Sequence, residues 1–228
     1  MGNQSSRTDN SVLDFTAINE HKGDNRLGSG SRGIDNDFNK GIVASDYARF
    51  NKLLGSKNWD GLVAAFKEKP QYAAFVDSKN HRGALPLHRA ILKLASLELI
   101  DLLIELYPPG VRVRDESGLL PLHYACLYNF CMEKHFNDLR DERDKTSWGW
   151  VLRELIEKYP QALQETDNEG RLPLHLASSS AKTSPKALEM LLLRYPDAIA
   201  RRTKLGKLPL HFALEARDAN YDAVNVLL

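Results

Sequence analysis

The chain has 228 residues, with 31 basic and 30 acidic side chains and a formal net charge of +1. This near balance argues against a general nucleic-acid binder, because contact with phosphates needs a surplus of Lys and Arg. The two cysteines, Cys126 and Cys131, are too few for a disulfide framework or a four-cysteine zinc site. No apolar run approaches the roughly 20 residues of a membrane span, and the first residues lack the apolar core of a secretory signal. We therefore expect a soluble, cytoplasmic protein of one large or two small domains.

Residues 1–40 are predicted to form a disordered N-terminal tail, because Gly, Ser, Asn and Asp dominate and apolar residues are sparse. The tail opens with the letters MGNQSS, a pattern typical of N-myristoylation at Gly2. An ordinary, unmodified terminus remains the alternative, since so short a pattern also arises by chance. A single myristoyl chain binds membranes marginally and reversibly, so we expect only weak or switchable peripheral contact with a membrane.

From residue 80 onward the chain repeats the pattern G-x-L-P-L-H-x-A. The four copies are at 83–90, 118–125, 170–177 and 206–213. Their histidines lie about 35 residues apart, except that the second interval is about 16 residues longer. A Tyr-Pro pair stands at a fixed distance before each of the last three copies. This shared phase indicates a repeated structural unit with one insertion.

Each unit is predicted to contain a turn, a short helix opened by proline, a connector and a longer helix that ends before Tyr-Pro. Proline suits the first helical position, and the residue before a proline is pushed out of the helical region. Apolar residues spaced i, i+3, i+4, i+7 precede each Tyr-Pro and indicate one buried face of the longer helix. These sets are Ile100, Leu103, Ile104, Tyr107; Leu152, Leu155, Ile156, Tyr159; and Leu188, Leu191, Leu192, Tyr195.

The four copies resemble the ankyrin repeat, whose signature is T-P-L-H-x-A with a period of about 33 residues. The resemblance covers about residues 80–228 and implies an all-α ankyrin-repeat solenoid of stacked helix pairs with protruding turns. Two features depart from the family pattern. Tyr-Pro stands where the family has glycine after the second helix, and leucine replaces the threonine of the turn. The leucines concerned are Leu85, Leu120, Leu172 and Leu208.

The domain that follows the tail is expected to begin with a capping unit that lacks the Leu-Pro-Leu-His turn, with helices at 45–54 and 57–69. The expected parts are an ankyrin-repeat domain over 41–228, a degenerate cap unit at 45–79, repeats from about 80, 115, 167 and 203, and an insertion at about 128–149. Three interpretations of the insertion remain open: a solvated loop, an extension of the first helix, or a loop that contacts a ligand. The last repeat is incomplete. We expect the protein to continue past Leu228, the alternative being an exposed apolar end that awaits a partner.

The side chains that could act in catalysis or metal binding are explained better as structural parts of the repeat. The motif histidines occupy the same place in successive turns, so they cannot converge on one metal ion. The resemblance implies that each of them bridges turn backbones. Cys131, Glu133 and His135 could form a Cys/His pair or ligands, but no third group that would orient them is evident. We therefore expect no enzymatic activity, no metal site and no cofactor.

The resemblance implies that a partner protein contacts the turn tips and first helices, on the concave face. The candidate partner-binding residues are His81, Arg82, Ala84, Glu116, Ser117, Leu119, Asn168, Glu169, Arg171, Lys204, Leu205 and Lys207. Their charges alternate in sign along the array, which favours a partner of mixed charge over a nucleic acid. The leading hypothesis is a monomeric scaffold or adaptor that acylation at Gly2 recruits to membranes. The alternative is an N-terminal regulatory ankyrin module of a longer enzyme or channel.

Overall fold

The computed structural model describes residues 44–75, 82–128, 148–179, 184–216 and 221–228. All described residues belong to one compact unit, Asn36–Leu228. The predicted tail and nearly all of the predicted insertion lie outside the described residues.

All elements in the described ranges are helical, so the prediction of an all-α fold is confirmed. The helices are α1 (Ala44–Gly55), α2 (Trp59–Glu68), α3 (Pro86–Leu92), α4 (Leu97–Leu106), α5 (Pro121–Tyr128), α6 (Trp148–Lys158), α7 (Pro173–Ser178), α8 (Pro185–Arg194), α9 (Pro209–Glu215) and α10 (Tyr221–Leu227). Four 3₁₀ helices follow second helices: η3 (Pro70–Ala74), η4 (Pro108–Arg112), η7 (Pro160–Leu163) and η8 (Pro196–Ala200). Within these ranges, none of the helices combines the length and the apolar character needed to cross a membrane.

The helices begin and end where the proline signals predict. Helices α3, α5, α7 and α9 each start at the proline of Leu-Pro-Leu-His. Helices α4 and α8 end just before Tyr-Pro, and the tyrosines Tyr107 and Tyr195 have φ angles of −139° and −145°. These angles lie outside the helical region, as expected for a residue before proline. The proline then opens a 3₁₀ helix instead of ending all helical structure.

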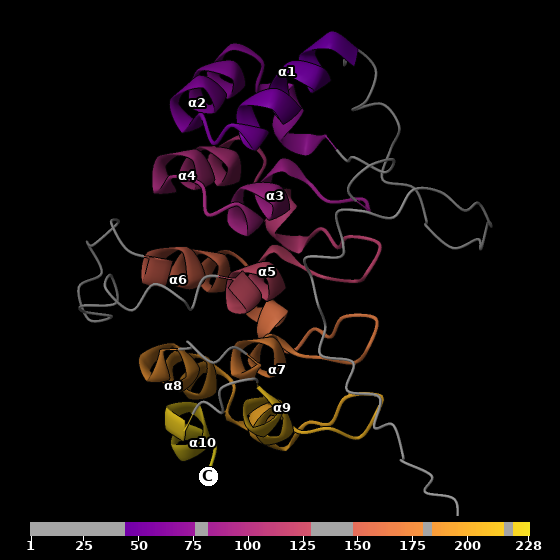
Figure 1. Ribbon diagram of the computed structural model, residues 1–228, viewed down its shortest axis with the longest axis vertical. Coiled ribbons are helices and arrows are strands. Elements are labelled where there is room, and N and C mark those ends of the chain that lie inside the picture. Colours follow the sequence, from indigo (N-terminus) through magenta and orange to yellow (C-terminus); the bar gives the residue numbers. More distant parts are fainter. Residues whose placement is uncertain (1–43, 76–81, 129–147, 180–183, 217–220) are drawn as a thin grey trace, which may run out of the picture. The chain divides into compact units, whose positions relative to one another are not determined.

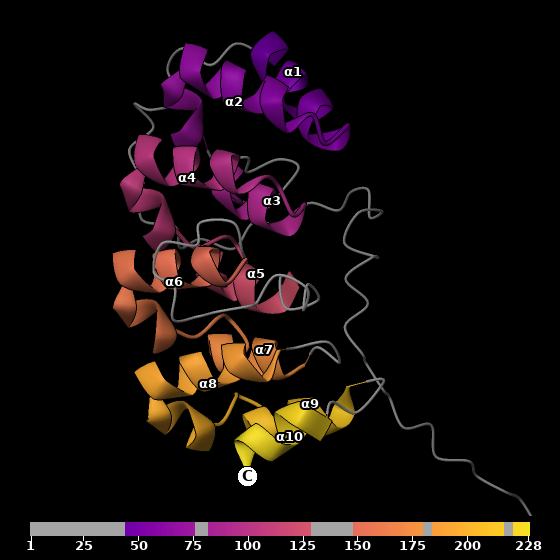
Figure 2. The same ribbon diagram turned by 90° about the vertical axis from the view of Figure 1, so that its left-hand side faces the viewer.

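The helices pack as pairs in two rows (Figures 1 and 2). The helices α3, α5, α7 and α9 contact one another in sequence, and each also packs against the helix that follows it. The predicted apolar face of each longer helix fills the space between the rows: Ile100, Leu103, Leu155, Ile156, Leu188 and Leu191 are all buried. A continuous hydrophobic core therefore joins every described helix pair.

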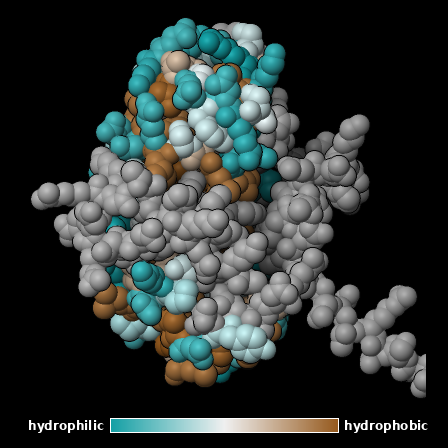
Figure 3. Space-filling view, turned by 60° about the vertical axis from the view of Figure 1, so that its left-hand side comes forward, coloured by the Kyte–Doolittle hydropathy of each residue, from teal (hydrophilic) through white to brown (hydrophobic). Residues whose placement is uncertain are grey.

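The two ends of this helical unit differ in polarity. Polar residues cover much of the surface over α1 and α2, whereas hydrophobic residues show at the opposite end (Figure 3). Among the described residues, the large hydrophobic side chains that are exposed all lie between Leu193 and Leu228.

Candidate functional site

Three loops project beyond the row of shorter helices (Figure 1), and together with the segment just before α3 they carry most of the predicted partner-binding residues. We call these four segments loop 1 (residues 82–85), loop 2 (113–120), loop 3 (165–172) and loop 4 (201–208). Each contains the motif glycine at a φ angle between +74° and +78°, a conformation that residues with a Cβ adopt only with strain. Loops 2, 3 and 4 therefore make the same tight turn, which closes with two backbone hydrogen bonds. In loop 3 these run from Gly170 N to Asp167 O and from Asp167 N to Arg171 O, each at 3.0 Å.

A polar side chain at the start of each of these turns fixes its shape. In loop 2, a carboxylate oxygen of Asp115 accepts hydrogen bonds from the backbone amides of Ser117 and Leu119, both at 2.8 Å. The equivalent Asp167 of loop 3 accepts from the amides of Glu169 and Arg171 at 2.9 and 2.8 Å, and these bonds satisfy amides that the turn leaves unpaired.

Loop 4 has threonine at the same position. Its hydroxyl oxygen, Oγ1 of Thr203, accepts a single bond from the amide of Lys207 at 3.2 Å. Loop 4 therefore has fewer side-chain restraints than loops 2 and 3, although its backbone follows the same course.

Consecutive loops are joined by backbone hydrogen bonds. Glu116 N donates to Arg82 O at 2.8 Å, Asn168 N donates to Ser117 O at 3.0 Å, and Lys204 N donates to Glu169 O at 3.0 Å. The three bonds repeat the same geometry from one loop to the next. They hold the loop tips in one row, so that the side chains of neighbouring tips lie next to each other.

The motif histidines connect the helices to the loops, as the resemblance implied. In all four units, Nδ1 of the histidine accepts a hydrogen bond from the amide of the leucine that precedes the helix, at 3.1 Å. In His175, Nε2 also lies 3.1 Å from the carbonyl oxygen of Arg201 in the next unit. Since Nδ1 accepts, Nε2 carries the proton and donates. This histidine therefore bridges two units.

Burial keeps these histidines neutral. It lowers the pKa of His88 and of His123 to about 4, although backbone carbonyls of the following unit oppose the shift. Burial also lowers the pKa of His175. A charged imidazole in these positions would lose its hydration, and this cost outweighs the attraction of the Asp167 carboxylate for His123 and His175. The histidines are thus part of the scaffold, whereas His211 of the last described unit is exposed.

The predicted partner-binding residues fall into three groups. Glu116, Asn168, Glu169, Lys204, Leu205 and Arg82 are exposed on the loops, and Ser117 and Lys207 are half-buried. Ala84, Leu119 and Arg171 are buried, with 4%, 7% and 5% of their surface exposed. His81 lies outside the described residues.

The residues that directly follow the motif glycines of loops 2 and 3, Leu119 and Arg171, are buried for a physical reason. The residue after each motif glycine turns back toward the shorter helix, so Leu119 joins the hydrophobic core. Arg171 instead forms an ion pair with the buried Asp167, Nε to Oδ2 at 2.6 Å. Arg171 therefore supports loop 3, and its side chain offers a partner little surface.

Arg114 joins loops 2 and 3 and was not singled out by the sequence pattern. Its Nη1 donates to the carbonyls of Gly118 and Thr166 at 2.8 and 2.6 Å, and its Nη2 pairs with the carboxylate of Glu165. The equivalent Arg202 of loop 4 makes the first of these bonds, to Gly206 O at 2.8 Å. The signal was present as an arginine four residues before each of these glycines.

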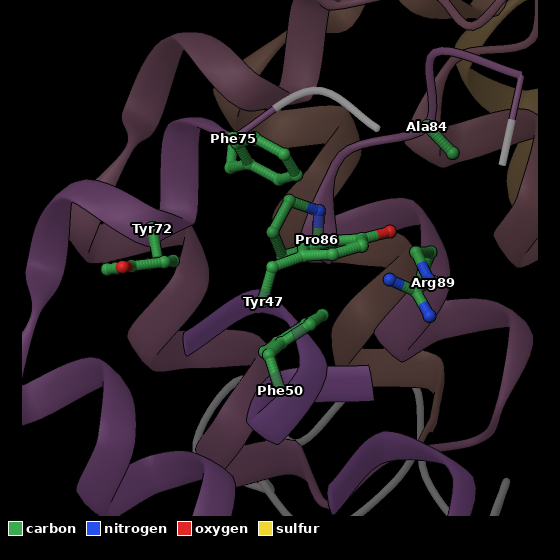
Figure 4. Close-up of a pocket in the computed structure, with 7 residues that line it drawn as sticks. All are labelled: Tyr47, Phe50, Tyr72, Phe75, Ala84, Pro86 and Arg89. Atoms are coloured by element: carbon green, nitrogen blue, oxygen red, sulfur yellow. The ribbon is translucent and has the colours of Figure 1, made fainter. Parts of the chain in front are cut away.

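A small hollow opens beside loop 1, between α1, η3 and α3 (Figure 4). The volume free of protein atoms is about 240 Å³, and it includes open solvent at the mouth of the hollow. Its lining residues are Tyr47, Phe50, Tyr72, Phe75, Ala84, Pro86 and Arg89. The rings of Tyr47 and Phe75 lie 5.0 Å apart between centroids, and the Arg89 guanidinium lies 5.3 Å from the centroid of Phe50. Of the lining residues only Ala84 was among the predicted partner-binding residues.

The side chains considered for chemistry do not assemble in the described part of the chain. Cys126 is fully buried, and burial raises the pKa of its thiol. Cys131, Glu133 and His135 lie outside the described residues. Within the described ranges, His, Cys, Asp and Glu do not form a group of three that could hold a metal ion.

Comparisons with known proteins add no family assignment. No protein-family model matches the chain, and no curated protein matches it either.

Proposed function

We propose that this protein is an ankyrin-repeat scaffold or adaptor, which binds a partner protein through loops 1–4 and the adjoining shorter helices. The observation that carries the proposal is the contrast between a repeated backbone and unlike side chains. The turns, their positive-φ glycines and the links between loops recur from unit to unit, while the exposed tips vary. Repeat proteins recognise partners through such a surface, because the repeated scaffold fixes its shape and the variable tips supply specificity.

The charges on the tips favour a protein partner of mixed charge. Glu116 and Glu169 are acidic, Arg82 and Lys204 are basic, and all four are exposed. Tips of both signs would repel part of a uniformly charged nucleic acid, whereas a protein surface can match them one by one. Leu205, which is 81% exposed, adds an apolar contact at the tip of loop 4.

The experiment compares two triple variants of identical composition. The loop variant carries Glu116→Ala, Lys204→Ala and Leu205→Ala. The control carries Glu157→Ala, Lys186→Ala and Leu193→Ala on α6 and α8, where all three side chains are also exposed. Affinity capture with the intact chain first identifies a partner, and both variants are then tested for it. We expect the loop variant to lose the partner and the control to keep it; retention by both would refute the proposal.

We also propose that Gly2 is myristoylated, and that the protein is a cytoplasmic monomer in weak, switchable contact with membranes. The sequence MGNQSS supports this. Incorporation of a myristate analogue by the intact chain, and its loss in Gly2→Ala, is the test. Membrane fractionation should fall in the variant, and a chain that takes up no label would refute acylation.

A further inference from the structure

Arg114 and Arg202 occupy the same place in loops 2 and 4, and each is held by its own loop in the same way. Both stand four residues before the motif glycine. In both, Nη1 donates to the carbonyl oxygen of that glycine, Gly118 or Gly206, at 2.8 Å. Because a guanidinium group is planar and rigid, this bond restricts where its other donors point. The two arginines therefore present their remaining donors in corresponding positions.

Arg114 shows what an arginine in this position can bind. Its Nη1 also donates to the carbonyl oxygen of Thr166 at 2.6 Å, and its Nη2 pairs with the carboxylate of Glu165. Both acceptors belong to loop 3, the next loop along the chain. A guanidinium group suits this task because its planar donors match the oxygens of a carboxylate. This place in the loop is therefore a carboxylate-binding position within the fold itself.

The turn does not require an arginine at this position. Loop 3 has threonine there, Thr166, and its backbone makes the same turn. At the place of Glu165, loop 4 has a second arginine, Arg201. The Arg202 side chain is exposed, and none of the described residues forms an ion pair with it. Loop 4 thus has the carboxylate-binding side chain of loop 2, while the described part of the chain supplies no carboxylate to it.

The surface around Arg202 is basic and partly apolar. Arg201 and Lys204 are also exposed, and within the described ranges neither forms an ion pair. Leu205 at the loop tip has 81% of its surface exposed, whereas the equivalent residues of loops 2 and 3 are polar. Such a surface is complementary to a segment that carries an acidic side chain beside an apolar one.

We propose that Arg202 is a carboxylate-binding position of the partner surface, and that loop 4 takes an acidic side chain of the partner protein together with an apolar neighbour. The carboxylate lies against Nη2 of Arg202, as that of Glu165 lies against Arg114, and the apolar neighbour covers Leu205. The two adjacent cations attract the same segment from a distance. The inference rests on the proposed function, because it names the partner chemistry at one loop of the same surface.

Two peptides test the chemistry of this subsite. The probe is acetyl-Ala-Leu-Glu-Leu-Glu-Ala-amide, and the control peptide has glutamine in place of both glutamates. Each is titrated to about 10 mM into the intact, ¹⁵N-labelled chain, because contact with one loop is expected to bind in the millimolar range. We expect shifts of the backbone amides of Arg202 and Leu205 with the glutamate peptide. The glutamine peptide should bind at least about fivefold more weakly, since it cannot form charge-assisted bonds.

Arg202→Thr gives loop 4 the residue that loop 3 carries at this position, so the fold should tolerate it. The glutamate peptide should bind this variant at least about fivefold more weakly. Arg202→Lys keeps the charge but loses the planar group, so its affinity should fall between the two. The matched control Arg194→Thr removes an exposed arginine at the end of α8 and should bind as the wild type does.

Urea unfolding separates a binding role of Arg202 from a structural one. Arg114→Thr breaks the bonds that join loops 2 and 3 and should lower the urea midpoint. The midpoint of Arg202→Thr should stay close to that of the wild type, because its side chain bonds only its own loop. A loss in Arg202→Thr as large as that in Arg114→Thr would make Arg202 a structural residue and overturn the inference.

Equal binding of the two peptides, or unchanged binding of the glutamate peptide by Arg202→Thr, would also overturn the inference. So would binding of the chain to vesicles of phosphatidylcholine with about 30% phosphatidylserine when the glutamate peptide does not bind, because loop 4 would then recognise a membrane. The loop surface as a whole is tested separately with the partner protein. A partner that is lost by the loop variant Glu116→Ala, Lys204→Ala, Leu205→Ala but bound at full affinity by Arg202→Thr would remove only the subsite and leave the proposed function standing.

Discussion

Lys204 donates its backbone amide to the carbonyl of Glu169 across 3.0 Å, and this bond ties loop 4 to loop 3. Gly170 lies directly beside it: a Cβ at position 170 would stand 2.9 Å from the nitrogen of Lys204. The glycine of the motif therefore meets two demands at once. It allows a φ angle of +78°, and it lets the next loop approach closely.

Gly170→Ala should destabilise the protein more than Gly206→Ala. Both positions have nearly the same positive φ, so both variants incur the backbone strain of about 1–2 kcal/mol. A Cβ at Gly206 meets nothing within 4 Å, whereas one at Gly170 displaces the backbone of loop 4. Urea unfolding measures the difference. Equal losses in the two variants would show that the close approach of the loops contributes nothing.

Asp167→Ala should cost far more stability than Thr203→Ala, although both residues begin a turn at the same place. Removal of the Asp167 carboxylate breaks the buried ion pair with Arg171 and two backbone hydrogen bonds, and leaves Arg171 only the half-exposed Glu169 as an anionic partner. The loss should be about 3–5 kcal/mol. Thr203→Ala removes one hydrogen bond of 3.2 Å and should cost about 1 kcal/mol. Thermal and urea unfolding of both variants test the ranking, which comparable losses would contradict.

The buried histidines should make the protein less stable in mild acid. Their pKa of about 4 in the folded protein lies below the ordinary value of 6.5, so the unfolded chain binds protons more readily. The stabilisation from each histidine is complete above pH 6.5 and is lost progressively as the pH falls toward 4. By pH 5 the loss should reach about 2 kcal/mol for His88 and again for His123.

The measurement compares urea unfolding at pH 7 and pH 5. Burial raises the pKa of the Asp115 carboxyl, so proton uptake by Asp115 in the folded protein offsets part of the loss from the histidines. His123→Gln should reduce the difference between the two pH values. An unfolding free energy that is the same at both, in the wild-type chain, would contradict this account of the histidines.

The sequence predicted the helices well because their signals are local. The prolines of Leu-Pro-Leu-His and Tyr-Pro restrict the backbone at their own positions and at the residue before. The shorter helices therefore begin, and the longer helices end, where these prolines predicted. The apolar faces were equally predictable, since helical spacing alone decides which side chains share a face.

The surface was harder to predict, because burial there depends on contacts between units. Arg171 looks like an exposed charge in the sequence, yet it is buried by its pairing with Asp167. The bonds from Arg114 to Thr166 and Glu165 likewise join residues that are distant in the chain. The hollow beside loop 1 depends on how far α1 stands from α3, which no motif encodes.

The measurement that tests the central claim most directly is the dissociation constant of one identified partner for three chains. These are the wild type, the loop variant Glu116→Ala, Lys204→Ala, Leu205→Ala, and the control Glu157→Ala, Lys186→Ala, Leu193→Ala. The loop variant should bind at least about tenfold more weakly, because truncation of even one residue that carries much of the binding energy costs about 2 kcal/mol or more. The control should stay within about twofold of the wild type. Equal affinities of the loop variant and the wild type would contradict the assignment of partner binding to the loops.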